Sequence, residues 1–455
     1  MRALLNDAAN RAIDYIENLP NRRVAPADAA VSRVAEFVEP LPEKGTDPAA
    51  ILAQLDDIGS AASVAMAGPR FFGFVIGGSL PSSTAANWLA TAWDQNTTMH
   101  RITPAVSTLE QVALDWIIDM LGLPRGAGGG FVTGATVANF TALAAARHSV
   151  LEAAGWDVEA DGLFGAPEIT VLVGEEAHPT LTKSLGLLGL GRNRVITVPV
   201  DSQGRMRANR LPRIDGPTII CTQVGNINTG ACDPVASVCE HARPASAWVH
   251  VDGAFGLWLA ASPTRKDFVD GIGLADSWAT DAHKWLNVPY DSGLAIVRDP
   301  ATLRAAMAIT AAYLQMDPSV RNPADYTPEL SRRARGVEVW AALKELGREG
   351  VAAMIDRDCD LAKRFADGFR EAGYEVLNDV VMNQVMISFG EAQTTESVIR
   401  AIQEDGTCWC GITQWQGRTA MRISVCNWST SAEDVERSLE AMIRIAGQIT
   451  TAGRE

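Results

Sequence analysis

The sequence lacks the features that mark a secreted or membrane-spanning chain. Its seven cysteines are odd in number and scattered, so they do not form the paired framework of a disulfide-stabilised secreted domain. No run of about 18 uncharged apolar residues is present. The amino terminus carries Asp7, Arg11 and Asp14 where a signal peptide needs an apolar segment. We therefore expect reduced thiols, no membrane association and a cytoplasmic location.

The sequence also lacks an excess of positive charge. The formal net charge is -15, whereas nucleic acids and anionic membranes attract surfaces rich in Lys and Arg. Neither is expected as the main partner. Cys408 and Cys410 have one residue between them, with no second pair and no nearby His, so no metal site is expected.

A chain of 455 residues exceeds one ordinary core, and three parts are predicted. Residues 1–66 form a helical arm, in which apolar residues keep a 3.6-residue spacing from Leu4 to Leu19 and Asp47-Pro48 begins a second helix. So short a segment cannot bury its own apolar face. We expect it to pack on another lobe or on a second subunit, in a homodimer.

Residues 67–335 are predicted to form a large α/β domain with a mostly parallel sheet. Short apolar runs rich in β-branched residues alternate with helical segments, as in strands covered by helices on both faces. These runs are 169–174, 194–200, 217–224, 247–255 and 293–299. Residues 336–455 are predicted to form a smaller α+β domain, with strands in 380–389 and 420–428, a helix around 395–404 and a last helix capped by Thr430 and Glu433.

Two segments carry the chemistry. The apolar run WVHVDGAFG ends its strand at Asp252, and ligands bind at the carboxyl ends of strands in such sheets. An isolated Asp there is as readily a turn residue. Lys284 follows in DSWATDAHKWLNV, where Trp278 and Trp285 leave little room for a solvated face. An amine in such surroundings can act as a nucleophile.

Taken together these segments resemble the pyridoxal-phosphate (PLP) dependent group II decarboxylases, which act on aromatic amino acids, glutamate and diaminobutyrate. The resemblance covers nearly the whole chain and is strongest from residue 107 to residue 285, with further agreement at AMRISVCNW (420–428). It implies the PLP-dependent transferase fold (fold type I), PLP as cofactor, a homodimer and decarboxylation of an L-amino acid to its amine and carbon dioxide.

The resemblance also implies roles for individual residues. Lys284 is expected to hold the cofactor covalently, and Asp252 to accept a hydrogen bond from its protonated pyridine nitrogen. His178 falls where the family stacks an imidazole on the cofactor ring, and Ala254 where a small side chain packs under it. His178 could otherwise be a structural histidine at the end of a strand.

The phosphate is expected at the start of the Ala-rich segment that follows Gly134. Backbone N–H groups of Ala135 and Thr136 would point at an anion there, as at any helix N-terminus. His283 matches a second phosphate contact of the family. Asn226 matches a polar position near the cofactor, but an ordinary turn residue explains it nearly as well.

The sequence departs from the aromatic decarboxylases near the cofactor and the substrate. Position 281 is Asp where they have Asn, which adds a negative charge. Phe74, Val75 and Ile76 replace an aromatic residue and a Pro-Thr pair in the segment that lines their substrate pocket. We therefore expect an apolar or aromatic substrate in a pocket of different shape.

The family's mobile loop, with its catalytic tyrosine, corresponds to residues 313–331. Tyr326 aligns in order but lies closer to the following Arg pair than in the aromatic decarboxylases, and Tyr313 is the other candidate. This tyrosine gives a proton to the substrate carbon after carbon dioxide leaves. Without it, oxygen can divert the reaction to an aldehyde.

Other functions stay open at this stage. Aldehyde-forming decarboxylation, carbon–carbon cleavage and transamination use the same cofactor. A nucleotide-binding oxidoreductase would use the glycines of GAGGG (126–130), but these lack the fingerprint spacing and fit turn glycines before a strand. An acidic substrate would need an Arg in the pocket, and Arg70, Arg101 and Arg422 are the candidates.

Overall fold

The computed structural model describes residues 1–309 and 320–452, which form two compact units. Unit 1 comprises residues 1–78, 361–377 and 385–455, and unit 2 comprises residues 79–360 and 378–384. The predicted boundaries after residues 66 and 335 stay a prediction. No helix in the described part of the chain is both long and apolar enough to cross a bilayer.

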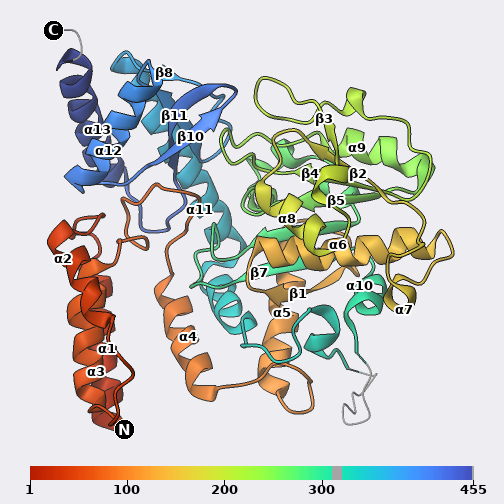
Figure 1. Ribbon diagram of the computed structural model, residues 1–455, viewed down its shortest axis with the longest axis horizontal. Helices are drawn as coiled ribbons and strands as arrows, with labels where there is room; N and C mark the ends of the chain where they lie inside the picture. The colour runs from red at the N-terminus through yellow and green to blue at the C-terminus, as the bar shows by residue number, and fades with distance from the viewer. Residues whose placement is uncertain (310–319, 453–455) are drawn as a thin grey trace. The chain divides into compact units, whose positions relative to one another are not determined.

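Unit 2 is built on a seven-stranded sheet with the order β1-β7-β6-β5-β4-β2-β3 (Figure 1). The strands are β1 (Gly128–Val132), β2 (Thr170–Gly174), β3 (Ile196–Val198), β4 (Thr218–Gln223), β5 (Trp248–Asp252), β6 (Ser277–Asp281) and β7 (Gly293–Val297). β7 pairs antiparallel with both β1 and β6, whereas the pairs from β6 to β3 are parallel. The mostly parallel sheet is confirmed.

Unit 2 also contains helices, of which α5, α6, α9 and α10 contact this sheet. The helices are α4 (Pro81–Trp93), α5 (Pro104–Met120), α6 (Ala135–Glu152), α7 (Val158–Asp161), α8 (Pro179–Leu187), α9 (Val235–Ala242), α10 (Pro300–Met307) and the first part of α11 (Gly336–Glu371), whose helical backbone is interrupted at Gly347. α6 lies across β5, β6 and β7 (Figure 1). Its small Ala side chains are buried and let the helix approach the strands closely, which brings its first turn to the edge of the sheet.

Five of the seven strands lie within the predicted apolar runs, and β6 was not predicted. A strand was expected directly after GAGGG, but β1 already begins at Gly128. The interpretation of GAGGG as turn glycines is wrong for Gly128–Gly130, which belong to β1. A Cβ atom on Gly129 would lie 1.9 Å from the carbonyl oxygen of Ala295 on β7. Glycine is therefore required inside this strand because the neighbouring backbone leaves no room for a side chain.

Unit 1 combines helices with a second sheet. Its helices include α1 (Arg2–Asn18), α2 (Asp28–Ser32), α3 (Pro48–Gln54), α12 (Ala392–Asp405) and α13 (Ala432–Ala452). Its four-stranded sheet, in the order β10-β11-β9-β8, contains β8 (Glu375–Val376), β9 (Gln384–Ser388), β10 (Gly411–Trp415) and β11 (Arg418–Ser424). Asp47 caps α3 as predicted, by accepting a hydrogen bond from the Ala50 amide. The last helix is capped by Ser431 and Asp434, one residue later than predicted, because Thr430 donates instead to the carbonyl oxygen of Pro69.

A buried ion-pair cluster joins α5 to the segment before α11. The Glu110 carboxylate is fully buried and contacts Arg332 at 2.8 Å and Arg321 at 3.1 Å. Burial by itself would raise the pKa of Glu110, but the two guanidinium groups hold that pKa below its ordinary value. Glu110 is therefore ionised, and its charge balances the buried guanidinium of Arg332 and the partly exposed one of Arg321.

We predict that Glu110→Gln lowers the free energy of unfolding by about 3 to 5 kcal/mol, because it leaves buried guanidinium charge unpaired. Urea titration should show the loss, and Glu345→Gln on the exposed face of α11 serves as the control. The pKa of Glu110 is lowered in the folded state. The difference in free energy of unfolding between wild type and variant should therefore be largest near neutral pH and should shrink as the pH falls through the folded-state pKa of Glu110. Equal stability of the two proteins near neutral pH would contradict this account.

Candidate active site

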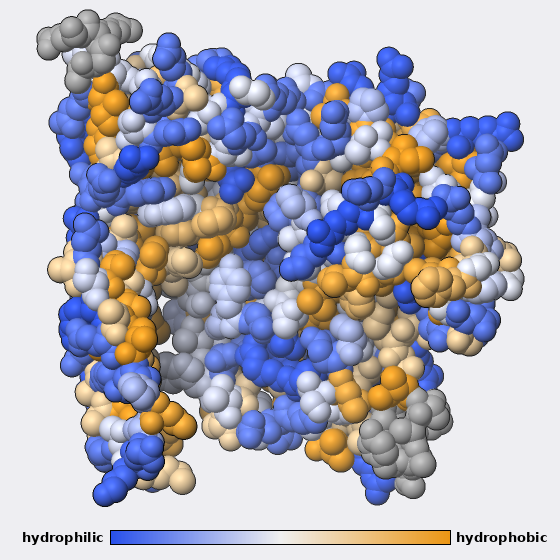
Figure 2. Space-filling model, viewed as in Figure 1, coloured by the Kyte–Doolittle hydropathy of each residue, from blue (hydrophilic) through white to orange (hydrophobic). Residues whose placement is uncertain are grey.

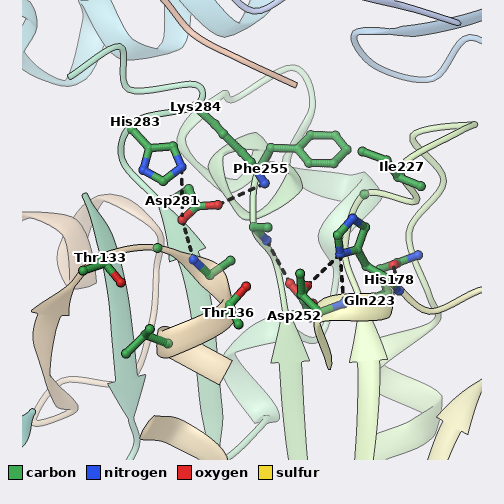
Figure 3. A pocket seen from close by; sticks show the side chains of 16 residues that line it. Thr133, Thr136, His178, Gln223, Ile227, Asp252, Phe255, Asp281, His283 and Lys284 are labelled. Atoms are coloured by element: carbon green, nitrogen blue, oxygen red, sulfur yellow. Dashed lines mark hydrogen bonds and ion pairs between the residues drawn. The ribbon is translucent and has the colours of Figure 1, made fainter. Parts of the chain in front are cut away.

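A cavity of about 300 Å³ opens at the carboxyl ends of β4, β5 and β6 (Figure 3). This is the edge at which α/β sheets bind ligands, because the loops that follow parallel strands meet there. Sixteen residues line it: Thr133, Gly134, Ala135, Thr136, Val137, His178, Thr180, Gln223, Gly225, Ile227, Asp252, Ala254, Phe255, Asp281, His283 and Lys284. The cavity thus brings together Lys284, Asp252 and His178 from three separate segments.

Lys284 follows β6 by three residues and reaches into the cavity. Its Nζ lies 3.0 Å from Oδ2 of Asp281 (Figure 3). Trp278 and Trp285 beside it are buried, as the sequence predicted. The Lys284 side chain itself keeps 19% of its surface exposed, so its amine is accessible from the cavity.

Asp252 is the last residue of β5 and is 5% exposed. Its Oδ2 accepts a hydrogen bond from Nδ2 of Asn139 at 3.0 Å, and its Oδ1 accepts one from the Ala254 amide at 3.3 Å. Burial raises the pKa of Asp252, whereas His178 and the Asn139 hydrogen bond act in the opposite direction. A cationic group bound beside this carboxylate would favour its ionised form.

His178 directly precedes α8, and its imidazole lies on the cavity side beside Asp252 (Figure 3). Its Nδ1 is 2.6 Å from the Thr180 hydroxyl and also accepts a hydrogen bond from the Thr180 amide. Its backbone amide donates to the Gln223 side chain at 3.1 Å. These contacts fix the plane of the ring over the opening.

The N-terminus of α6 forms an anion site at the other side of the cavity. The Ala135 amide donates to Oδ1 of Asp281 at 2.6 Å, and Thr136 follows it in the first helical turn. A Cβ atom on Gly293 would lie 2.5 Å from the Cα of Gly134, so Gly at 293 lets β7 and the turn before α6 meet. The helix dipole and free N–H groups favour a negative charge here, which Asp281 now supplies.

His283 completes this anion site. Its Nδ1 accepts a hydrogen bond from the Ser292 amide at 3.1 Å, so the neutral ring carries its proton on Nε2. Nε2 lies 3.6 Å from Oδ1 of Asp281. Burial lowers the pKa of His283, which keeps the ring neutral and makes Nε2–H a hydrogen-bond donor toward the cavity.

Five residues singled out from the sequence are not among those that line the cavity: Asn226, Tyr326, Phe74, Val75 and Ile76. Asn226 is buried, but its Oδ1 accepts hydrogen bonds from the Asn228 and Thr229 amides, so it stabilises its own turn. Tyr326 packs against a cluster of buried apolar side chains that includes Val297 and Leu303. It lines a different cavity beside α5 and β1, where the Arg321 guanidinium lies 4.7 Å from its ring centroid. Tyr313 falls outside the described residues.

The segment Phe74–Ile76 belongs to unit 1. Phe74 is 58% exposed and its ring stacks on Trp409 at 5.9 Å, whereas Val75 is buried. Arg70 is also buried in unit 1, where it donates to the carbonyl oxygens of Thr407 and Pro20. Its guanidinium is therefore occupied by structural hydrogen bonds.

Several lining residues were not predicted from the sequence. Gln223 ends β4 as Asp252 ends β5, and this shared position at a strand end could have identified it. Ile227 and Phe255 follow those strands, but nothing in their residue types marks them as lining residues. Asn139, one helical turn after Ala135, does not line the cavity but contacts Asp252. It was not predicted because an Asn in an Ala-rich helix has no spacing signature.

The donor set fits pyridoxal phosphate. An accessible amine, a buried carboxylate and a helix N-terminus with a neutral His donor surround one cavity, which matches the aldehyde, the pyridine nitrogen and the phosphate of that molecule. Within residues 1–309 and 320–452, no cluster of three or more His, Cys, Asp or Glu could hold a metal ion.

Comparison with known proteins agrees with this geometry. Residues 37–389 match the pyridoxal-dependent decarboxylase conserved domain. The chain is 25% identical to an aromatic-L-amino-acid decarboxylase of Bacillus atrophaeus, over 98% of this chain and 94% of that protein. It is 27% identical to an L-2,4-diaminobutyrate decarboxylase of Rhizobium meliloti (strain 1021), over 91% and 85%. It is 25% identical to a phenylacetaldehyde synthase of Arabidopsis thaliana, over 71% and 70%.

Among solved structures, the crystal structure of Oryza sativa TDC with PLP and tryptamine superposes with a TM-score of 0.90, at 23% identity, over 98% of this chain and 97% of that one. Fold type I and PLP dependence, both expected from the sequence, are confirmed. Because the family match spans most of the chain, this protein belongs to the pyridoxal-dependent decarboxylase family and is a PLP-dependent carboxy-lyase.

Proposed function

We propose that this protein decarboxylates an L-amino acid with an apolar or aromatic side chain and releases the corresponding amine. The observation that carries the proposal is the placement of Lys284, Asp252 and the N-terminus of α6 around one cavity. When bound, PLP supplies an electron-accepting ring that stabilises the carbanion left after carbon dioxide departs.

The residues of the chain have distinct tasks in this proposal. Lys284 would hold the cofactor through its amine. Asp252 would stabilise a proton on the pyridine nitrogen through its negative charge. Ala135, Thr136 and His283 would donate hydrogen bonds to the phosphate, and His178 and Ala254 would contact the ring.

The lining of the cavity supports an uncharged substrate side chain. Val137, Ile227 and Phe255 contribute apolar surface, and no Arg occurs among the described residues that line it. An acidic side chain would need such a partner, since a buried carboxylate without one is costly. The assignment of Phe74, Val75 and Ile76 to the substrate pocket stays a prediction from the family resemblance.

A second reaction, aldehyde-forming decarboxylation, is favoured by one observation. No Tyr lies among the described residues that line the cavity, and Tyr326 faces the cavity beside α5. Without a nearby phenol to protonate the substrate carbon, one dioxygen and one water per amino acid would give aldehyde, carbon dioxide, ammonia and hydrogen peroxide. The role of Tyr326 as that acid stays a prediction.

The proposal includes a homodimer. The helical arm carries apolar side chains that are largely exposed in one chain, among them Leu5, Val38 and Leu41 at 62%, 87% and 92%. Figure 2 shows apolar side chains gathered on this part of the surface. Exposed apolar area of this kind is typical of a subunit interface, and an arm too small for its own core gains burial from a second copy.

We also propose a cytoplasmic location. All seven cysteines are free thiols, and six of them are buried. A reducing compartment keeps such thiols unpaired.

The proposed reaction predicts defined products. Holoenzyme incubated with pooled L-amino acids should release carbon dioxide and one amine from an aromatic or aliphatic amino acid, detected by mass spectrometry. Equal amounts of aldehyde and hydrogen peroxide in place of amine would select the second reaction instead. Consumption of an added oxo-acid without carbon dioxide would contradict both.

The same assay includes a matched pair of variants. Lys284→Ala should lower turnover by several orders of magnitude, because it removes the covalent cofactor contact, whereas Lys183→Ala on the exposed face of α8 should leave turnover unchanged. Borohydride should attach the cofactor to the peptide that contains Lys284 and to no peptide of the Lys284→Ala variant.

Asp281 should weaken cofactor binding. Its carboxylate accepts a hydrogen bond from the Ala135 amide and approaches His283, both of them donors proposed for the phosphate, so two negative charges would compete there. Asp281→Asn should therefore tighten PLP binding to the apoprotein about tenfold, measured by equilibrium dialysis. Weaker binding in the variant would contradict this account.

The proposed dimer can be tested by light scattering. The wild type should have twice the mass of one chain, and Val38→Asp with Leu41→Asp should shift it toward monomer by placing charge in the apolar interface. Phe164→Asp, at an exposed position in unit 2, controls for loss of exposed apolar surface in general. A wild-type monomer with full activity would overturn the dimer.

A further inference from the structure

A chain of buried polar side chains lies behind Asp252. Trp248, His250 and Asp252 alternate along β5 with Val249 and Val251, so the three share one face of the sheet. His250 is completely buried, and its partner on β6 across the ladder is Ser277. In a strand covered on both faces, apolar residues would pack at these positions at lower cost.

Hydrogen bonds connect these side chains into one continuous path. Trp248 Nε1 donates to the Ser277 hydroxyl at 2.8 Å, and the same hydroxyl lies 2.8 Å from His250 Nδ1. On the other side of the ring, His250 Nε2 lies 2.8 Å from Oδ1 of Asn139 on α6. Asn139 Nδ2 then donates to Oδ2 of Asp252 at 3.0 Å.

With Asp252 ionised, only one arrangement of protons satisfies every member of this path. An ionised Asp252 accepts only, so Asn139 must turn its amide nitrogen toward it and its carbonyl oxygen toward His250. His250 must then carry its proton on Nε2, and its Nδ1 accepts from the Ser277 hydroxyl. Burial lowers the pKa of His250 to about 3, so the ring stays neutral and keeps this tautomer.

We propose that His250 and Asn139 are positioning residues that orient the Asp252 carboxylate and hold it ionised toward the pyridine nitrogen of the cofactor. This inference rests on the role proposed for Asp252. His250 fixes the rotamer and the amide orientation of Asn139, and Asn139 stabilises the negative charge. Loss of either allows Asp252 to turn or to become protonated, so the ring nitrogen loses its proton more easily.

Three further charged groups act on Asp252. His178 faces it from the turn before α8, and Lys284 and Asp281 face it from the end of β6. All three line the cavity, whereas His250, Asn139 and Ser277 do not. Of the hydrogen bonds that make up the buried path, only the bond from Asn139 to Asp252 involves a residue that lines the cavity. A substitution in the path is therefore expected to affect the cofactor through Asp252, and this permits a direct test.

The test uses holoenzyme loaded with PLP that carries ¹⁵N at the pyridine nitrogen. The ¹⁵N chemical shift reports whether this nitrogen is protonated as the pH is raised. We expect Asn139→Leu and His250→Leu to lower the pH at which the proton is lost by about 1 to 2 units, the size expected for one hydrogen bond to a charged group. His250→Gln, whose amide can still donate to Asn139, should restore most of the wild-type value.

Thr280→Val is the matched control. Thr280 lies in the same sheet, its buried hydroxyl has no hydrogen-bond partner among the described residues, and its removal should leave the titration unchanged. Ser277→Ala, a smaller change at the far end of the path, should shift the titration in the same direction. It replaces His250→Leu in the test if that variant does not fold. Wild-type titration in folded Asn139→Leu, or in both Ser277→Ala and His250→Leu, would overturn the inference.

Asp252→Asn separates this inference from the proposed role of Asp252. If Asp252→Asn deprotonates the ring nitrogen while Asn139→Leu does not, only the positioning role of the buried path fails. If Asp252→Asn leaves the nitrogen protonated, the role of Asp252 itself is wrong.

Discussion

The proposed function depends on keeping one carboxylate ionised where burial disfavours its charge. Asp252 ends a central strand and is almost inaccessible to water, so its ionised form needs compensation from the protein. The compensation comes from Asn139 behind it and from His178 and Lys284 in the cavity. A cationic pyridine ring placed beside Asp252 would add to it, so cofactor binding and the ionisation of Asp252 favour each other.

Parallel strands explain how residues far apart in the sequence reach this carboxylate. β4, β5 and β6 are adjacent and parallel, so Gln223, Asp252 and Asp281 arrive at one edge of the sheet. The anion site at the N-terminus of α6 follows β1, and the turn between β1 and α6 contacts Gly293 at the start of β7. The two charged ends of the cavity, the carboxylate and the helix N-terminus, are thus set by strand order.

Strand prediction succeeded where burial on both faces produced a continuous apolar run, as in β2, β4 and β5. It missed β6, since SWATD combines small, polar and aromatic residues and precedes the reactive lysine. It placed the start of β1 too late, since three glycines were attributed to a turn, although the backbone of β7 leaves no room for a side chain at Gly129. Both errors have one cause: these strands are shaped by contacts with neighbours that local composition does not record.

The sequence by itself determined the family and the cofactor, and it predicted Lys284, Asp252 and His178 as the central residues, because covalent and acid–base chemistry requires particular residue types. Only the tertiary structure decided which residues support them. Asn139 and His250 join Asp252 because α6 crosses β5, and Asp281 meets Ala135 because β6 ends beside the first turn of α6. Such contacts depend on strand order and helix packing, and no spacing along the chain encodes them.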